Sequence, residues 1–447
     1  MSAADPKAIE RGLARALARV GLGGPEGLHR LTGGATMESW RFEAGGKAFV
    51  LRRAPSLAFM DARPFGHDTE AALILAAHGA AVAAPEVITV LAPEDGIGSG
   101  FVMRALPGTA DPRAILAMAD PATILREAAR NLARIHALPR SELPADVPVM
   151  DYRAAIADLH QQFEEAGGDR PIIAAGLKWI ADHCPDACEP VLNHGDFRMG
   201  NILAENGRLT GVLDWELAHF GDPHEDLAFG CMAVWRFARY DRPALGLGSL
   251  EDYFAAYEAE SGHAVDPARW RYWLVHRTVW WALGCLRNAR FWRSGEDRML
   301  ERVVISRRTS EQELDLLMLL EEEVPEAERV RSLPPPNPPQ VMLGEAGNAE
   351  IATAVSEWLE TLKGKVEGHD RFQLAVARNA LGMIARADAT GARSQNRELA
   401  QALLSGERSL GEPGLLAQLR RGALDKLAAD VPKYPALDVA KAKWENA

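Results

Sequence analysis

Cysteine is scarce in this sequence, with four residues in a chain of 447. So few cysteines in so long a chain do not make a disulfide framework of the kind that stabilises small secreted domains. The segment before residue 25 has no apolar stretch bounded by a cleavage site, so we expect no signal peptide. A reducing cytoplasm is therefore the simplest expected compartment.

Long hydrophobic runs and an excess of positive charge are also missing. The nearest approach to a membrane span, "AALILAAHGAAVAAP" at 71–85, is interrupted by His78 and Gly79, and we expect no span. The 50 basic residues are outnumbered by 62 acidic ones, which gives a formal net charge of -12. Nucleic-acid binders usually present a basic face, so a general nucleic-acid partner is not expected. The length and the 47% hydrophobic content predict two or three packed globular units.

The N-terminal third alternates like a small sheet. Residues 37–52 predict a β-hairpin that turns at Gly45-Gly46. Residues 66–79 have helical spacing, and the runs "EVITVL" and "GFVMRAL" predict two further strands. The pattern becomes helical from about residue 112, where Ile124, Ala128, Leu132 and Ile135 fall on one face of a helix.

A proline-rich run, "SLPPPNPPQ" at 332–340, cannot hold helix or sheet and predicts a spacer between domains. We therefore expect four parts: a β-rich lobe at 1–105, a mainly helical lobe at 106–331, the linker at 332–340, and an all-α domain at 341–447. In the last part an apolar helical stripe is expected at Phe372, Val376, Ala380, Met383 and Ile384. No catalytic signature marks this tail, which is a candidate surface for a homodimer or a protein partner.

The segment 193–223, "NHGDFRMGNILAENGRLTGVLDWELAHFGDP", places three polar residues at intervals in an otherwise strand-like stretch. These are Asp196 in a loop, Asn201 where the run "NIL" begins, and Asp214 at the end of "GVLD". Phosphoryl transfer needs a carboxylate beside the attacking group and a metal that bridges phosphate oxygens. Mg²⁺ prefers oxygen ligands, usually one or two side chains with phosphates and water. The pattern favours Asn201 and Asp214 as metal ligands, with Asp196 facing the substrate.

Two motifs in this segment carry a family resemblance. "HGDFRMGN" resembles the catalytic loop of aminoglycoside phosphotransferases and related small-molecule kinases, and "GVLDWELAHFGDPHEDLA" is similar to the metal-binding segment that follows it. The resemblance covers roughly residues 30–310. It implies a bilobal, protein-kinase-like α+β fold that uses ATP and Mg²⁺, with Asp196 as catalytic base and Asn201 and Asp214 as Mg²⁺ ligands. It also implies bracing roles for His194 and Asp226.

The resemblance extends to the expected nucleotide site in the β-rich lobe. Arg52, at the end of "FVLRR", stands where such kinases place a phosphate-binding lysine, and Glu70 matches its acidic partner. "FVMRALPG" resembles the hinge between lobes, which implies that the backbone at Met103 and Ala105 meets adenine. "LTGGAT" stands at the glycine loop with Gly33 and Gly34, although it lacks the protein-kinase pattern. The closest branch resembles the kinase domains associated with acyl-CoA dehydrogenases.

Other interpretations of the central segment stay open. The three polar residues would also fit a hydrogen-bonded hairpin without metal. Arginine at position 52 would suit a pseudokinase that binds nucleotide without turnover, since a guanidinium forks where an ammonium points. A structural adaptor would bind no nucleotide at all. A zinc site would need four converging ligands, for which the candidates are His183, Cys184, Cys188 and His194.

The acceptor is the least determined part. The aromatic and basic segment 270–293 contains Arg277 and Trp281, which are candidate acceptor contacts, although such stripes usually pack in a core. Arginines suit carboxylate or phosphate, which favours an anionic acceptor such as a hydroxyacyl-CoA. The acidic cluster Asp222, Glu225 and Asp226 would instead suit a cationic acceptor such as an aminoglycoside.

Overall fold

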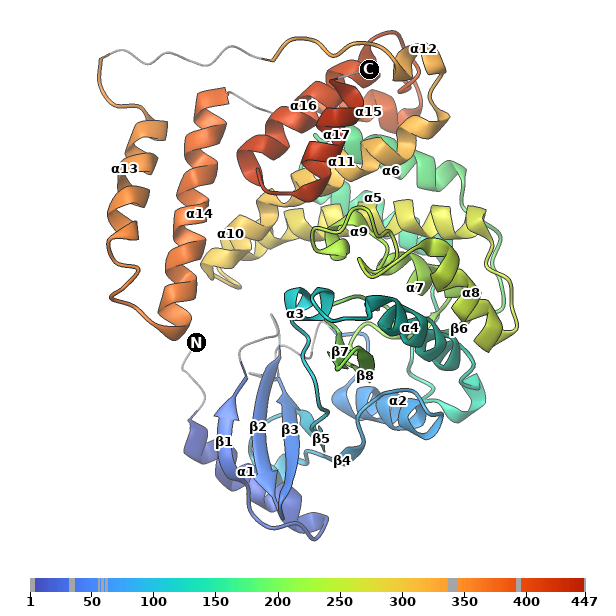
Figure 1. Ribbon diagram of the computed structural model, residues 1–447, viewed down its shortest axis with the longest axis vertical. Helices are drawn as coiled ribbons and strands as arrows, with labels where there is room; N and C mark the ends of the chain where they lie inside the picture. Colours follow the sequence, from blue (N-terminus) through green and yellow to red (C-terminus); the bar gives the residue numbers. More distant parts are fainter. Residues whose placement is uncertain are drawn as a thin grey trace.

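The structure is a computed structural model that describes residues 5–31, 37–54, 57, 60, 63–336, 344–390 and 395–445. Its N-terminal part is built on an antiparallel sheet of strand order β1-β2-β3-β5-β4. The elements are α1 (Pro6–Arg19), β1 (Glu26–Arg30), β2 (Glu38–Ala44), β3 (Lys47–Arg53), α2 (His67–Gly79), β4 (Val87–Val90) and β5 (Gly100–Arg104). Figure 1 shows this lobe at one end of the molecule.

The two faces of the sheet are used differently, because successive side chains of a strand point to opposite sides. Phe49, Leu51 and Val102 pack against the apolar side of α1. Phe101, next to Val102 in β5, belongs instead to the large core of the second lobe. Arg52, next to Leu51, therefore points away from α1 and towards the second lobe. The predicted hairpin is confirmed, with β2 and β3 joined at Gly45 and Gly46, both at positive φ.

The second lobe is mainly helical and carries two short two-stranded sheets. Its elements are α3 (Pro112–Leu116), α4 (Pro121–His136), α5 (Tyr152–Glu165), α6 (Pro171–Asp182), β6 (Val191–Asn193), β7 (Ile202–Glu205), β8 (Arg208–Val212), β9 (His219–Gly221), α7 (Pro223–Phe229), α8 (Leu250–Ser261), α9 (Pro267–Ser294), α10 (Leu300–Arg307), α11 (Thr309–Leu320) and α12 (Glu326–Arg329). The sheets pair β6 with β9 and β7 with β8. The expected stripe of α4 is confirmed, because Ile124, Ala128, Leu132 and Ile135 are all fully buried.

The C-terminal part is all-helical, as expected. It contains α13 (Asn348–Glu360), α14 (Gly368–Thr390), α15 (Arg397–Ser405), α16 (Leu415–Asp430) and α17 (Pro435–Trp444). Leu403, Leu416 and Trp444, on α15 to α17, share one hydrophobic core with the second lobe. The helices α13 and α14 instead form a pair that lies to one side, next to α10 (Figure 1). The stripe expected on α14 is only partly covered, because Met383 is buried while Phe372 and Ile384 stay exposed.

The division at 332–340 into separately folding domains remains a prediction, and residues 337–340 of that linker lie outside the described residues. Within the described part of the chain, no helix combines the length and the apolar character that crossing a membrane requires.

Candidate active site

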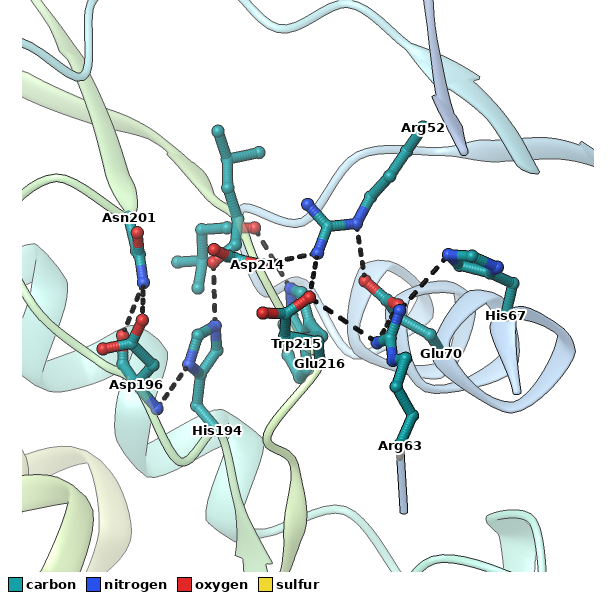
Figure 2. A network of polar contacts seen from close by, with 12 residues as sticks. Arg52, Arg63, His67, Glu70, His194, Asp196, Asn201, Asp214, Trp215 and Glu216 are labelled. Atoms are coloured by element: carbon teal, nitrogen blue, oxygen red, sulfur yellow. Dashed lines mark hydrogen bonds and ion pairs between the residues drawn. The ribbon is translucent and has the colours of Figure 1, made fainter. Parts of the chain in front are cut away.

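The loop between β6 and β7 holds the polar residues predicted from the sequence. Asp196 and Asn201 lie in this loop, and the side-chain amide of Asn201 donates to Asp196 Oδ2 at 2.5 Å and to the Asp196 carbonyl at 2.9 Å. Figure 2 shows the two side chains facing each other. The side-chain nitrogen Nδ2 of Asn201 is therefore occupied within the loop, and its side-chain oxygen Oδ1 is the atom that could contact a ligand.

Arg198, which was not among the residues expected from the sequence, contacts both carboxylate oxygens of Asp196. Its guanidinium forms a bidentate pair with the carboxylate, with Nε 2.7 Å from Oδ1 and Nη2 3.2 Å from Oδ2. The guanidinium also stacks on Trp235, 4.3 Å from the ring centroid. The signal in the sequence was an arginine two residues after the aspartate in "HGDFR".

The environment of Asp196 is unusual for a carboxylate. Burial raises its pKa most strongly and the nearby charge of Asp214 adds to this, while the charge and hydrogen bonds of Arg198 oppose it. The result is a pKa raised to about 6. A group with this pKa is ionised at neutral pH and can still accept a proton, as general-base chemistry requires.

His194 connects the Asp196 loop to the segment that carries Asp214. Its Nδ1 accepts from the Asp196 amide at 3.3 Å, and its Nε2 lies 3.0 Å from the carbonyl of Leu213. These two partners define a neutral ring with the proton on Nε2, and burial accordingly lowers the pKa of His194. A second link joins the Leu213 amide to the Asn201 carbonyl at 2.8 Å.

Asp226, at the start of α7, holds the same loop from behind. Its buried carboxylate accepts from the amides of His194 at 2.6 Å and Gly195 at 2.9 Å, and it lies 3.3 Å from His136 Nε2. Gly195 has φ of +81°, and a Cβ there would lie 2.2 Å from the Leu217 carbonyl, so only glycine fits. The expected bracing roles of His194 and Asp226 are consistent with these contacts and stay proposals.

We expect Asp226→Asn to lower stability by about 1–3 kcal/mol, because one of the two buried amides then faces an NH₂ group instead of an acceptor. The measurement is the urea midpoint of unfolding, with Asp182→Asn as the control. Asp182 lies on α6 with its side chain 50% exposed, so its variant should unfold at the wild-type midpoint. A wild-type midpoint for Asp226→Asn would contradict the bracing role.

Arg52 reaches across from β3 to the segment that carries Asp214. Its Nη2 donates to Asp214 Oδ1 at 2.6 Å and to Glu216 Oε2 at 2.9 Å, and its Nε forms an ion pair with Glu70 Oε1 at 3.0 Å. Figure 2 shows Arg52 pointing towards all three carboxylates. Burial alone would lower the pKa of Arg52, but the three negative charges outweigh it and leave the pKa above its ordinary value.

These contacts give a physical reason for arginine at this position. A guanidinium presents donors on several edges, so Arg52 can contact Glu70 through one edge and two further carboxylates through another. A lysine ammonium is a single point of charge on a flexible stem and cannot span the same three partners in this way. Arginine in place of the expected lysine therefore has three carboxylate partners here, those of Glu70, Asp214 and Glu216.

The structure adds Arg63 and Glu216 to the site, and the sequence analysis had named neither. Arg63 pairs with Glu70 at 2.7 Å and lies 3.8 Å from Glu216. Burial and the charge of Asp214 raise the pKa of Glu216 to about 7, against the opposing charges of Arg52 and Arg63. The sequence signal for Glu216 was its place two residues after Asp214 in "LDWE".

The oxygen atoms of Asp214 and Asn201 suit Mg²⁺, which needs few protein ligands, better than a metal ion that needs four or more protein ligands. Asp214 offers a carboxylate that is about a third exposed, and Asn201 offers its side-chain oxygen Oδ1, since its Nδ2 donates to Asp196. Among the described residues no group of three or more His, Cys, Asp or Glu side chains converges as a metal cage. Mg²⁺ usually takes few protein ligands and completes its shell with phosphates and water, so a two-residue donor set is sufficient.

The remaining nucleotide candidates are placed as follows. Met103 lies in β5 opposite Val50, and the Ala105 amide donates to the Ala48 carbonyl at 3.0 Å. Both therefore continue the backbone pairing of β5 with β3. Gly33 and Gly34 lie outside the described residues.

The two acceptor candidates differ in their surroundings. Arg277 is buried and its guanidinium pairs with the buried carboxylate of Glu225, which keeps it away from solvent. Burial lowers the pKa of Arg277 to about 9. Trp281 is only partly buried and packs on Trp235, 5.3 Å between ring centroids. Because Trp235 also stacks on Arg198, Trp281 is the candidate that connects with Asp196.

The chain is similar to known proteins over the region that contains this site. A family model described as "Phosphotransferase enzyme family" matches residues 27–272. Mouse acyl-CoA dehydrogenase family member 10 is 28% identical over 276 residues, which cover 56% of this chain and 25% of that protein. Hygromycin-B 4-O-kinase of Escherichia coli is 26% identical over 221 residues, which cover 45% of this chain and 60% of that protein. The chain spans less than two thirds of the length of both relatives.

Solved structures share the fold. A provisionally assigned aminoglycoside phosphotransferase of Ralstonia eutropha superposes with a TM-score of 0.57 at 20% identity, over 71% of this chain and 98% of that one. A thermostable mutant of aminoglycoside phosphotransferase APH(4)-Ia, in ternary complex with AMP-PNP and hygromycin B, gives a TM-score of 0.50 at 18% identity, over 71% and 98% of the two chains. The expected bilobal, protein-kinase-like α+β fold is thereby confirmed.

Proposed function

This chain belongs to the phosphotransferase enzyme family, and from that premise we propose that it transfers the γ-phosphoryl group of ATP, with Mg²⁺, to a hydroxyl of a small molecule. The observation that carries the proposal is the arrangement of Asp196, which is buried, held by Arg198 and Asn201, and linked through His194 to the Asp214 segment. This is the carboxylate, set beside a candidate metal site, that phosphoryl transfer requires.

In this proposal Asp196 orients the acceptor hydroxyl and takes its proton. Arg198 keeps the carboxylate ionised, and Asn201 fixes its direction. Asn201 and Asp214 hold Mg²⁺, which when bound neutralises charge on the phosphate oxygens. Arg52, anchored by Glu70, binds the nucleotide phosphates once they replace its contacts with Asp214 and Glu216. Met103 and Ala105 contribute backbone at the adenine, and Gly33 and Gly34 remain proposed nucleotide-binding residues.

The acceptor we propose is anionic, a hydroxyacyl-CoA in the first instance. Two similar proteins carry the name acyl-CoA dehydrogenase family member, which supports acyl-CoA chemistry as a starting point. Trp281 is the proposed acceptor contact, and Arg277, which pairs with Glu225, lies one turn before it on α9. An aminoglycoside acceptor is the second candidate, because a hygromycin-B kinase is among the relatives.

Acceptor-dependent ADP formation tests the proposal. Wild-type protein is given Mg²⁺ and ATP with a panel of hydroxyacyl-CoAs, hygromycin B and other aminoglycosides, choline and sugars. The proposal predicts ADP formation that depends on a hydroxyacyl-CoA, and dependence on an aminoglycoside alone would favour the second candidate. Binding of Mg·ATP without turnover on any acceptor would instead favour a pseudokinase.

The pH dependence of kcat/KM for ATP should show an acidic limb that belongs to Asp196. The base works in its ionised form, and its pKa is raised to about 6, so activity is present above pH 6 and falls about tenfold per pH unit below it. Glu216 also has a raised pKa, so Glu216→Gln is the control. This variant should keep the acidic limb, which would show that the limb belongs to Asp196 and not to Glu216. A profile that stays flat down to pH 5 would contradict the assignment of Asp196.

A further inference from the structure

A large cavity lies away from the residues assigned to phosphoryl transfer. Its volume is about 1330 Å³, and it is bounded by α5, α9 and α10 on one side and by α13, α14 and α16 on the other. Figure 1 shows the α13–α14 pair beside α10. None of the residues that line it belongs to the network of Arg52, Asp196 and Asp214. A volume of this size exceeds that of most drug-sized ligand sites, so it would hold a longer molecule.

One side of the cavity is apolar and comes largely from the α13–α14 pair. The apolar lining includes Leu283, Leu286, Ile351, Ala352, Val355, Leu381 and Ile384. Ile351 and Ile384 are 53% and 51% exposed, which is unusual for large aliphatic side chains inside a concave surface. Contiguous exposed apolar surface of this kind marks a binding surface more often than plain solvent contact.

The other side is strongly basic in a protein whose net charge is -12. Six cationic side chains line the cavity against three acidic ones. The cations are Arg170, Arg287, Arg290, Arg293, Arg307 and Lys426, and the acids are Glu165, Asp169 and Asp388. Five of these cations lie on α9, on α10 or just before α6, while most of the large apolar residues lie on α13 and α14, so the lining as a whole is amphipathic.

Two of these arginines have no direct ion pair among the described residues, although the charges of Asp158 and Glu296 act on Arg287 from further away. Arg170 pairs with Glu313, while Arg307 and Lys426 share Asp430. In contrast, neither Arg287 nor Arg293 has an ion-pair partner in the part of the chain that the structure describes. Burial lowers the pKa of Arg287 and the positive charge of Arg290 lowers it further, while the negative charges of Asp158 and Glu296 oppose this shift. Two guanidinium groups without a direct ion pair, in a lining of six cations and three acids, favour an external anion, and guanidinium groups suit phosphate in particular.

We propose that this cavity binds a soluble single-chain amphiphile that carries phosphate, with its hydrocarbon chain along α13 and α14 and its phosphate at Arg287 and Arg293. Two sources share this chemistry: a simple alkyl or acyl phosphate, and an acyl thioester of coenzyme A. The inference does not rest on the proposed kinase activity, because it uses none of the residues assigned to that activity.

A chain of side-chain contacts connects the cavity to the loop that carries Asp196. Trp281 contacts Trp235, which stacks on Arg198, and Leu283 lines the cavity two residues further along α9. A ligand in the cavity therefore contacts the helix that also contributes the candidate acceptor residue.

Equilibrium binding of octyl phosphate to the full-length protein, below its micelle concentration, tests the proposal. We expect saturable binding that Arg287→Ala combined with Arg293→Ala weakens about 10- to 100-fold, the usual range for losing charged hydrogen bonds. Val355→Asp, on the apolar side, should weaken binding as well. Arg130→Ala, which removes an exposed arginine of α4 outside the cavity, is the matched control and should bind like wild type.

Two further ligands check that both halves of the amphiphile are needed. Octyl glucoside keeps the chain without the charge, and inorganic phosphate keeps the charge without the chain, so each should bind much more weakly than octyl phosphate. Octanoyl-CoA that binds more tightly than octyl phosphate would identify a coenzyme A thioester as the source, and the reverse order would identify a simple phosphate ester. Either order supports the site.

The result that overturns the proposal is octyl phosphate that does not bind, or that binds equally to wild type and to the double arginine variant. Melting temperatures of all variants show whether a loss of binding reflects unfolding. Asp196→Asn should bind octyl phosphate like wild type, so failure of the kinase assignment and failure of this site give different results.

Discussion

Asp196→Asn is expected to lower kcat for phosphoryl transfer by about 10²–10⁴, the usual contribution of a positioned general base. Asparagine keeps the shape of the side chain and can still contact Asn201, but it cannot accept the proton of the acceptor hydroxyl. Affinity for Mg·ATP should change little, because Asp196 is not one of the proposed metal ligands. Steady-state kinetics with saturating acceptor, together with nucleotide binding by calorimetry, measures both quantities.

Asp182→Asn is a matched control for this variant. It makes the same chemical change at the last residue of α6, where the half-exposed side chain of Asp182 pairs with Lys178. This control should keep the wild-type kcat. Asp196→Asn with a wild-type rate would show that another group takes the proton. Loss of nucleotide binding together with activity would assign Asp196 to the metal instead.

Asp214→Ala is expected to weaken binding of Mg·ATP by about 100-fold or more. Loss of an outer-shell partner alone typically costs 10- to 100-fold in metal affinity, so loss of a ligand should reach at least the upper end of that range. The variant also removes one of the three carboxylates that hold Arg52, which frees that guanidinium for phosphate. Calorimetric titration of ATP with and without Mg²⁺ separates the two effects.

The control for Asp214 is Asp241→Ala, an exposed aspartate that pairs with Arg239 and Arg242. It should bind Mg·ATP like wild type. For Asp214→Ala, we expect the enhancement of ATP affinity by Mg²⁺ to disappear, while metal-free ATP binds as well as before or better. An Mg²⁺ enhancement that survives in the variant would place the metal elsewhere.

Sequence patterns predicted the local structure well where the signal was periodic. The hairpin at Gly45-Gly46 and the buried stripe of α4 follow from strand alternation and helical spacing, and both are present. Asp196 was expected in a loop and lies in one, whereas Asn201 was expected to begin a strand and is the residue before β7. Asp214 was expected to end a strand, whereas β8 ends at Val212 and Asp214 has φ of +69° in the following turn.

The parts that sequence could not predict depend on contacts between distant segments. Arg63 joins the site from the loop before α2, and nothing in its neighbours marks it as a partner of Glu216, more than 150 residues away. Arg277 is of a residue type that often binds anionic ligands, but the buried carboxylate of Glu225 already neutralises its charge. Only the packing of α7 against α9 reveals that pairing.

The same limit applies to the C-terminal part. Its helices were predictable from apolar spacing, but the cavity between α13, α14 and the second lobe exists only in three dimensions. The arginines of α9 looked like one basic edge in the sequence. The structure separates them into Arg277, which is neutralised inside the core, and Arg287 and Arg293, which line the cavity.

The most direct test of the central claim is transfer of label from [γ-³²P]ATP to an acceptor in a single turnover, with Mg²⁺ present, by wild type and by Asp196→Asn. The acceptor is the panel member that gives the most ADP. The account predicts labelled acceptor from wild type and a rate about 10²–10⁴ lower from Asp196→Asn, with both proteins binding Mg·ATP. Equal rates of transfer by the two proteins, or label that passes only to water, would contradict it.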